Sequence, residues 1–291
     1  DKTVFPRGLA GPVIQWNGGN PNDIYYVHAY NEFFEFEGYQ AVPPPSRFSF
    51  PTMPDDVWLK LTASTAGPVN VDIARYDGNK AYMAKKQTWT IAPANLTGAV
   101  YYWEVNNGKV VRLTIGDTGP EQFVQSNRCT ACHSVSKDGS RIVASFDAGW
   151  SPWTTIYSAT GAVLYSAETA SGFQAISPNG SHVIWGQSDG SGVLRLSAYN
   201  NKQFSASLTT PGGAAVHPVW AGDGVRVALA QRTNGNWLDF TVSSLWLTEV
   251  DLMNNAFNNT KKIVDPTPPL STTTFPTFSP DSQWIAFMRA N

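Results

Sequence analysis

At 291 residues the chain is long enough for one large domain or two ordinary ones. Its formal net charge of −2 gives no basic field that would attract nucleic acid, and no apolar run approaches the roughly 18 residues of a transmembrane helix. Only 14% of the residues are charged, whereas aromatic residues reach 13% and glycine and proline number 24 and 20. This mixture favours many short strands joined by turns, so we expect an all-β protein.

Residues 1–122 predict an antiparallel β domain. Apolar residues alternate in short segments at roughly ten-residue spacing, which is typical of a β-sandwich of the immunoglobulin or fibronectin type. The last two segments form a predicted hairpin, because an Asn-Gly turn at residues 106–108 separates them. The expected strands are Val13–Trp16, Ile24–Tyr30, Phe33–Tyr39, Arg47–Phe50, Val57–Thr62, Val69–Tyr76, Gln87–Ile91, Ala99–Val105 and Lys109–Ile115. The turn-rich segment Gly116–Pro120 then predicts the boundary with a second domain, over residues 123–291.

The second domain opens with the only two cysteines of the chain, Cys129 and Cys132, and His133 follows them directly. C-x-x-C-H is the attachment pattern of c-type haem. Each thiol can form a thioether with one vinyl group, and the histidine can bind the iron as its proximal ligand. We therefore expect one covalent haem c, held by Cys129 and Cys132, with His133 as the iron ligand.

Three other interpretations of the cysteine pair stay open. A redox disulfide usually lies at a strand-to-helix junction in a βαβ pattern, which does not surround this pair. A zinc site would need two further ligands at short spacing. A structural disulfide would be ordinary in an exported protein.

From residue 123 onward, one pattern recurs four times: an apolar strand, a turn similar to Ser-Pro-Asp-Gly, and a second strand. The central Asp or Asn of the four turns is residue 138, 179, 223 or 281, so the copies lie 41, 44 and 58 residues apart. A period of this length predicts the blades of a β-propeller. The longer last interval predicts an additional hairpin within residues 231–262 of the third blade.

These copies resemble the TolB-like, or PD40, propeller repeat, and the resemblance covers residues 130–291. A β-sandwich followed by C-x-x-C-H that runs directly into the first blade is similar to a group of exported bacterial TolB-like proteins and c-type cytochromes. The resemblance implies haem at Cys129, Cys132 and His133, and it implies no particular reaction. Covalent haem would also imply the periplasm or the cell surface, so we expect a mature chain from which the signal peptide has been removed.

The copies amount to three blades and half of a fourth, whereas propellers typically close with four to eight. An open array would leave long strand edges unpaired. We therefore expect either that the chain is a fragment of a longer propeller or that a partner chain completes it.

The sixth iron ligand would decide the chemistry of the haem. His217 lies six residues before Asp223, close to the place that His133 has in the first blade, which makes His217 a candidate distal ligand. A filled sixth position favours electron transfer, and an open one permits peroxide or gas chemistry. The further candidates are His28, Met53, Met83, Met253 and Met288.

The function that follows is an exported c-type haem protein that passes single electrons to a redox partner protein, with the β domains as a docking scaffold. Two alternatives remain. One is a non-enzymatic binding or assembly module in which Cys129 and Cys132 form a disulfide, and the other is a five-coordinate haem enzyme of the peroxidase type. The sequence contains no phosphate-binding loop, nucleophile elbow or H-E-x-x-H, and it suggests no catalytic residue.

Overall fold

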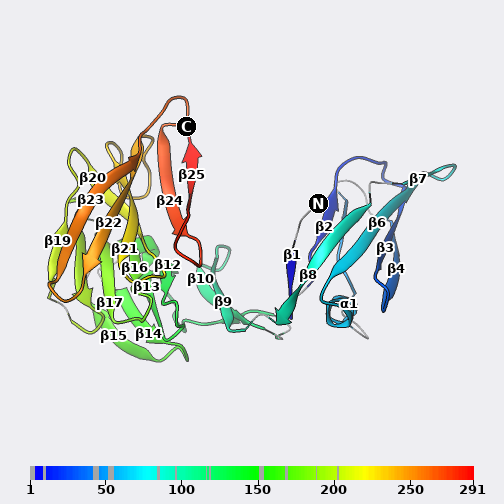
Figure 1. The fold of residues 1–291 in the computed structure, drawn as a ribbon, viewed down its shortest axis with the longest axis horizontal. Helices are drawn as coiled ribbons and strands as arrows, with labels where there is room; N and C mark the ends of the chain where they lie inside the picture. The colour runs from blue at the N-terminus through cyan, green and yellow to red at the C-terminus, as the bar shows by residue number, and fades with distance from the viewer. Residues whose placement is uncertain are drawn as a thin grey trace. The chain divides into compact units, whose positions relative to one another are not determined.

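A computed structural model gives the fold of the chain. It describes residues 4–8, 11–41, 46–51, 56–83, 86–95, 97–115, 117, 119–150, 154–167, 170–187, 189–201 and 203–291. Strands dominate this part of the chain, together with one short α-helix and one 3-10 turn, so the all-β prediction is confirmed (Figure 1). The chain divides into two compact units, the first made of Asp1–Ala99 and Thr114–Thr118 and the second of Val100–Leu113 and Gly119–Asn291.

The first unit is a sandwich with unequal layers. Its large sheet has the order β1 (Val4–Arg7), β8 (Gln87–Asn95), β6 (Pro68–Tyr76), β3 (Ile24–Tyr30) and β4 (Glu35–Gln40), with β7 (Ala81–Met83) paired to β6. A two-stranded sheet of β2 (Ile14–Trp16) and β5 (Ser46–Phe48) and the helix α1 (Val57–Ser64) form the other layer. The core lies between the layers, where Val27 and Val71 of the large sheet pack with Phe48 and Trp58.

Helix α1 occupies the segment for which a strand was predicted over Val57–Thr62. The Asp56 side chain caps the helix by accepting a hydrogen bond of 2.7 Å from the backbone N–H of Leu59. Trp58, Leu61 and Thr62 share the buried face at helical spacing. The strand prediction was wrong because so short an apolar run fits both periods, and the aspartate cap favours the helix.

The predicted hairpin forms, but it packs with the second unit. Strands β9 (Ala99–Glu104), β10 (Lys109–Thr114) and β11 (Glu121–Gln122) make a three-stranded sheet. Val110 of β10 is fully buried with Phe123 and Ile142, which anchors the hairpin on the first blade. The compact units therefore divide at this hairpin, whereas the sequence predicted a boundary at residue 122. Within the predicted linker, residues 116 and 118 lie outside the described part of the chain.

The second unit contains the blades that the repeat predicted. Three antiparallel sheets of four strands are followed by one of two strands, and each sequence copy supplies the first two strands of its sheet. Consecutive inner strands, β12, β16, β20 and β24, contact one another, as propeller blades do around a channel. The blades are β12 (Thr130–Val135), β13 (Arg141–Phe146), β14 (Thr154–Ser158) and β15 (Val163–Ala167); β16 (Ser171–Ile176), β17 (His182–Gln187), β18 (Leu194–Ala198) and β19 (Ala206–Leu208); β20 (Ala214–Trp220), β21 (Arg226–Arg232), β22 (Ser243–Asp251) and β23 (Ala256–Val264); and β24 (Thr272–Phe278) with β25 (Ile285–Ala290).

The additional hairpin predicted for the third blade does not form. Residues 231–262 become the end of β21, a loop over Thr233–Val242, and the outer strands β22 and β23, so this blade has four strands like the first two. The extra length goes into outer strands of nine residues each and into the loop, which places Trp237 in the interior.

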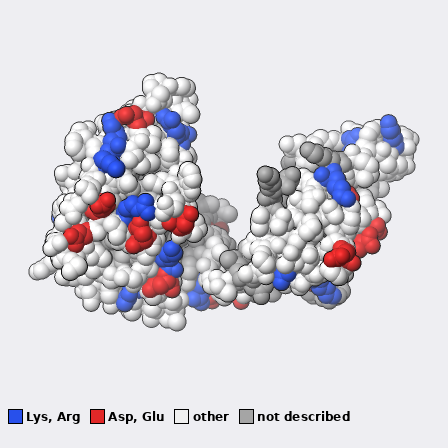
Figure 2. Space-filling model, in the orientation of Figure 1, with Lys and Arg blue, Asp and Glu red and all other residues white. Residues whose placement is uncertain are grey.

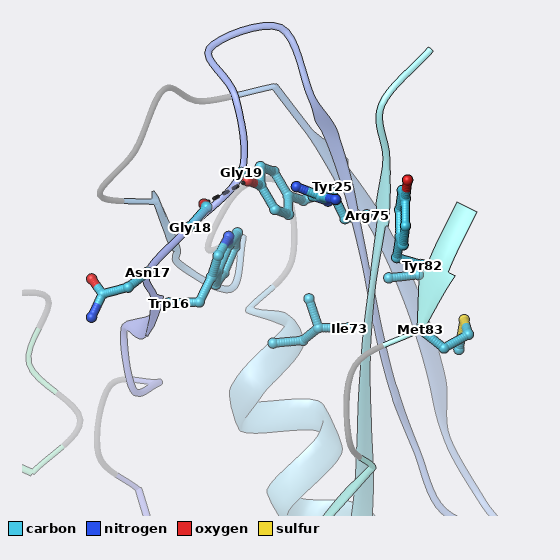
Figure 3. Close-up of a pocket in the computed structure, with 10 residues that line it drawn as sticks. Trp16, Asn17, Gly18, Gly19, Tyr25, Ile73, Arg75, Tyr82 and Met83 are labelled. Atoms are coloured by element: carbon cyan, nitrogen blue, oxygen red, sulfur yellow. Dashed lines mark hydrogen bonds between the residues drawn. The ribbon is translucent and has the colours of Figure 1, made fainter. Parts of the chain in front are cut away.

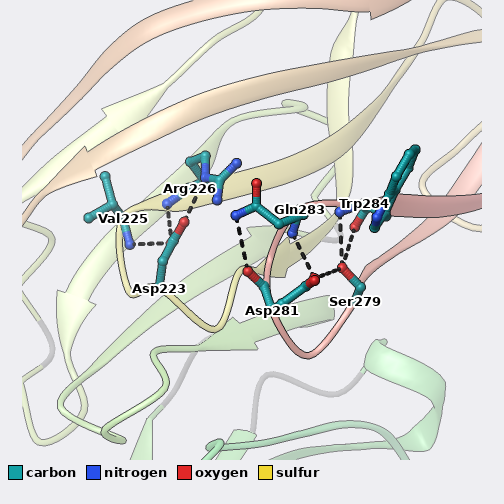
Figure 4. Close-up of polar contacts among 7 residues, drawn as sticks. All are labelled: Asp223, Val225, Arg226, Ser279, Asp281, Gln283 and Trp284. Carbon is teal, nitrogen blue, oxygen red and sulfur yellow. Dashed lines mark hydrogen bonds and ion pairs between the residues drawn. The ribbon is translucent and has the colours of Figure 1, made fainter.

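Each inner strand ends in the same kind of turn. In the third blade, Asp223 accepts hydrogen bonds from the backbone N–H groups of Val225 and Arg226, and in the fourth, Asp281 accepts one from Gln283 (Figure 4). The residue that directly follows the Asp or Asn of each turn takes a positive φ, which explains why three of the four turns use glycine there. These residues are Gly139 (69°), Gly180 (70°), Gly224 (78°) and Ser282 (60°).

The surface carries few charges and mixes their signs. On the face drawn in Figure 2, acidic and basic side chains are interspersed over the second unit, in keeping with the net charge of −2. Among the described residues, no helix is long and apolar enough to cross a membrane.

Candidate functional site

The C-x-x-C-H segment lies where the chain enters the first blade. Cys129 directly precedes β12, and Cys132 and His133 lie within that strand. The pairing of β12 with β13 shifts at Cys132, because Ala131 faces Ser145 whereas His133 faces the adjacent residue, Ala144. Cys132 is therefore the extra residue of a β-bulge, a feature that re-aims side chains and is frequent beside functional sites.

Both cysteines are free, half-buried thiols. The sulfur of Cys129 lies against the β9–β10 turn, where a Cβ added to Gly108 would be 3.1 Å from it. Burial raises the pKa of the Cys132 thiol to about 11, with a hydrogen bond to Ser145 acting in the opposite direction. The Gln174 side chain of the next blade donates a hydrogen bond to the backbone carbonyl of Cys132. Neighbouring elements thus hold the segment in place from two sides.

The imidazole of His133 is kept neutral. Burial lowers the pKa of His133, and a hydrogen bond with the backbone of Tyr101 acts in the opposite direction. Neutral imidazole is the form that binds metals. Trp103 lies two residues beyond Tyr101, hence on the same face of β9, and it is 43% exposed. The motif therefore lies beside a strand that presents an aromatic ring to solvent.

The donor set fits haem better than zinc. In the described part of the chain, only one group of three potential ligands brings its atoms within 4.8 Å of one another, and that group does not include Cys129, Cys132 or His133. A zinc site needs such convergence. Covalent haem does not, because the porphyrin itself separates the two thioethers from the iron. Two free thiols and a neutral imidazole in this order are what attachment requires.

His217 lies on an inner strand, as expected, but both of its ring nitrogens are already engaged. Nε2 lies 3.1 Å from the carbonyl oxygen of Trp237 and donates to it, and the hydroxyl of Thr274 lies 2.5 Å from Nδ1. The ring stacks on Phe275 with 4.5 Å between centroids, and only 4% of the residue is exposed. Burial lowers the pKa of His217 to about 4. Iron would have to displace one of these bonds, so the structure does not support His217 as the distal ligand.

His217 was suggested by its place in the repeat, but that place differs by one residue from the place of His133. His217 lies six residues before the Asp of its turn, whereas His133 lies five before its own, so the residue equivalent to His217 in the first blade is Cys132. The equivalent residues of the other blades are Phe173 and Phe275, whose rings meet His217 at 4.1 and 4.5 Å. Counted from the turn, the counterpart of His217 in the first blade is therefore Cys132, and His133 is its neighbour.

The other candidates for a sixth ligand are not singled out by their contacts. Nε2 of His28, in β3, lies 2.7 Å from a carboxylate oxygen of Glu35. Met83, Met253 and Met288 are 71%, 93% and 47% exposed. Met53 lies outside the described residues.

A concave site that the sequence did not predict lies within the first unit. Its cavity of about 420 Å³ is lined by aromatic side chains, among them Trp16, Tyr25 and Tyr82 (Figure 3). Arg75 lies 4.4 Å from the ring centroid of Tyr82 and forms an ion pair of 3.2 Å with the buried Asp23. Because that pair cancels the charge, the cavity suits an uncharged ligand. Alternation placed Trp16 and Tyr25 in strands, but only β7, a strand that the sequence did not predict, adds Tyr82.

Comparison with known proteins gives two structural likenesses. TolB from Acinetobacter baumannii is 16% identical, with a TM-score of 0.44, and the match covers 77% of this chain and 60% of that protein. A TolB-assigned protein from Agrobacterium tumefaciens is 15% identical, with a TM-score of 0.48, and the match covers 73% and 74% of the two chains. No protein-family model and no curated protein matches the chain. The propeller assignment therefore rests on the blades described above.

Proposed function

We propose that the chain is a c-type haem protein that carries single electrons. Cys129 and Cys132 would hold one haem c through thioethers, and His133 would bind its iron. The observation that carries this proposal is a pair of free thiols, three residues apart, followed by an imidazole that burial keeps neutral. The bound haem would supply one-electron redox chemistry.

The surrounding residues have a supporting role in this proposal. The bulge at Cys132 and the hydrogen bond from Gln174 fix the backbone of the motif against the neighbouring blade. The partly buried environment of His133 would keep water from the iron ligand, which is one way in which a protein sets a redox potential. A redox partner protein would dock where the motif meets solvent, on the side of Trp103. Covalent haem would place the protein in the periplasm or at the cell surface.

The decisive experiment is expression of the chain together with periplasmic haem-maturation machinery. We expect a c-type pyridine haemochrome spectrum and an intact mass that exceeds the mass of the polypeptide by one haem. Cys129→Ser combined with Cys132→Ser should abolish both signals. His133→Ala should keep the covalent haem but change its ligand-sensitive absorption bands, whereas His182→Ala, at a half-buried histidine of another blade, should change neither. A haem-free chain under conditions that load a reference cytochrome c would refute the proposal.

A second candidate function is a non-enzymatic binding module. The aromatic cavity around Trp16 and Tyr82 favours it, since such cavities are the usual sites of small-molecule binding. In this case Cys129 and Cys132 would form a disulfide, and the intact mass would rise by two hydrogen atoms on reduction. The fold itself is compatible with both functions.

A five-coordinate haem enzyme of the peroxidase type is the third candidate. The engagement of both nitrogens of His217 favours it over a bis-histidine site. Addition of cyanide or peroxide to the haem-loaded chain should then shift the absorption spectrum, whereas a six-coordinate electron carrier should respond weakly.

A further inference from the structure

His28 lies in β3, between β4 and β6 of the large sheet of the first unit, on the face opposite the core. Tyr25, Val27 and Ala29 of β3 are buried, so the alternate residues, His28 among them, point to the other face. In the sheet register, His28 is directly opposite Glu37 of β4 on one side and Asp72 of β6 on the other. The imidazole therefore lies between two strands that both carry carboxylates. Figure 2 shows acidic side chains gathered over the part of this unit where β4 lies in Figure 1.

The side chains around His28 converge. Nε2 lies 2.7 Å from an oxygen of Glu35, and one ligand atom each from His28, Glu35 and Glu37 lie within 4.8 Å of one another. Nδ1, on the other side of the ring, lies 3.9 Å from a carboxylate oxygen of Asp72. The hydroxyl of Tyr26 donates a hydrogen bond of 2.6 Å to Glu37. Each nitrogen of the imidazole thus faces a carboxylate, and one of the two glutamates has a positioning partner.

The imidazole is packed between tyrosine rings, whereas the carboxylate of Glu35 is exposed. The ring of His28 stacks on Tyr30, with 4.2 Å between centroids and planes 17° apart, and Tyr26 flanks its other face at 5.9 Å. The side chain of His28 is 18% exposed, and that of Glu35 is 66% exposed. Lys86 lies over the ring of Tyr30 and donates to its hydroxyl. Its charge acts on Tyr30 and on Asp72, and not on the two glutamates.

We propose that His28, Glu35 and Glu37 bind a divalent transition-metal ion of the zinc class, and that Asp72 orients the imidazole from behind. Nε2 and one oxygen from each glutamate would supply three ligands and leave a fourth position for water, which is a common zinc arrangement. Ligand atoms on a tetrahedron with bonds of about 2 Å lie about 3.3 Å apart, so shifts of about 1 Å in the exposed carboxylates complete the site.

The chemistry of these side chains argues for this class of ion. Calcium and magnesium take oxygen ligands, and an imidazole nitrogen at the centre of the group disfavours them. A histidine that binds zinc usually directs its other nitrogen at a carboxylate or a carbonyl group, which is the relation between His28 and Asp72. An ordinary ion pair would need only one carboxylate, and this imidazole is approached by three.

The test is a calorimetric titration of the full chain with Zn²⁺ after metal has been removed with a chelator. Cys129 and Cys132 are first replaced by serine, so that zinc cannot bind at C-x-x-C-H and the outcome is independent of the haem proposal. We expect one ion per chain. His28→Ala should abolish that binding, and Asp72→Asn should weaken it by about 10–100-fold. His182→Ala, at a histidine of the second unit, is the matched control and should leave the affinity unchanged.

A second measurement separates loss of the site from loss of the fold. Glu35→Gln combined with Glu37→Gln keeps the size of both side chains and an acceptor for Tyr26. Zinc should raise the unfolding temperature of the parent chain, followed by circular dichroism, and should leave that of this variant unchanged. An equal affinity in the parent and in His28→Ala, or the absence of stoichiometric binding to a folded parent, would overturn the proposal.

Discussion

The buried position of Cys132 predicts that folding slows the reaction of its thiol. The test uses the reduced, haem-free chain with Cys129→Ser, in which Cys132 is the only thiol. Burial is the main cause of the rise in its pKa from 9.0 to about 11, so the substitution of Cys129 removes only a minor contribution. At pH 8 the thiolate fraction then falls from about 10% in the unfolded chain to about 0.1% in the folded one.

The rate should fall by less than the thiolate fraction does. A thiolate of higher pKa is a stronger nucleophile, and a Brønsted coefficient of about 0.45 over two pKa units restores roughly eightfold in rate. The thiol of the folded chain should therefore react with a small aromatic disulfide about tenfold more slowly than that of the unfolded chain. Steric shielding in the bulge adds to this difference, so tenfold is the smallest effect expected.

The assay follows release of the reagent thiolate in buffer and in urea concentrated enough to unfold the chain, from pH 7 to 9.5. The rate of the folded chain should rise about tenfold for each pH unit across the whole range, whereas that of the unfolded chain should bend near pH 9. N-acetylcysteine corrects for the effect of urea on the reagent, and circular dichroism monitors the fold. Equal rates in the two solvents, or a folded-state profile that levels off near pH 9, would show that Cys132 is solvated and that the bulge does not shield it.

Three further predictions concern the scaffold. Burial lowers the pKa of His217 from 6.5 to about 4. The neutral imidazole therefore contributes fully to the free energy of unfolding above pH 6.5, and this contribution is lost as the pH falls towards 4. Urea unfolding at pH 4.5 should give a free energy of unfolding about 2.5 kcal/mol lower than at pH 7, and His217→Gln should remove most of that difference. Gly172→Ala should cost about 1–3 kcal/mol in denaturant unfolding, because its Cβ would lie 2.2 Å from the ring of Trp237, whereas Gly119→Ala, with nothing within 4 Å, should be neutral or slightly stabilising. Ser282→Gly should raise the unfolding free energy by about 0.5–1 kcal/mol, since a serine there holds a φ of 60°.

The blades could be predicted from the sequence because their turns depend on local chemistry. Asp138 accepts the backbone N–H of Ser140 two residues later, and Gly139 supplies the positive φ between them. Both requirements are met within four residues, so they leave a signature that does not depend on the rest of the fold. Four such signatures in phase were enough to place all four inner strands.

The first unit shows where local pattern is insufficient. The segment after Asp56 contains apolar residues that suit a strand as well as a helix, and the structure forms a helix because Trp58 and Leu61 bury together in the core. Over eight residues, periods of two and of 3.6 cannot be separated by counting. The hairpin at residues 99–114 was predicted correctly as a hairpin, but its assignment to a unit depends on Val110, whose buried neighbours follow it in the chain.

The candidate haem site depends both on a local sequence pattern and on contacts between residues far apart in the chain. The order of Cys129, Cys132 and His133 is local, so the sequence was sufficient to suggest the cofactor. The position of the Cys132 backbone and the pKa of His133 depend on residues far away in the chain. Gln174, which binds the carbonyl of Cys132, lies 42 positions from it, and Tyr101 approaches His133 from another sheet. These contacts form only when β12 has paired, and the burial of Cys132 in the folded blade leaves a thiol that ionises poorly. In the unfolded chain the same thiol has an ordinary pKa and is open to solvent. If the proposed haem is present, its attachment must therefore precede the folding of the first blade, and the strand then closes around a segment that already carries its cofactor.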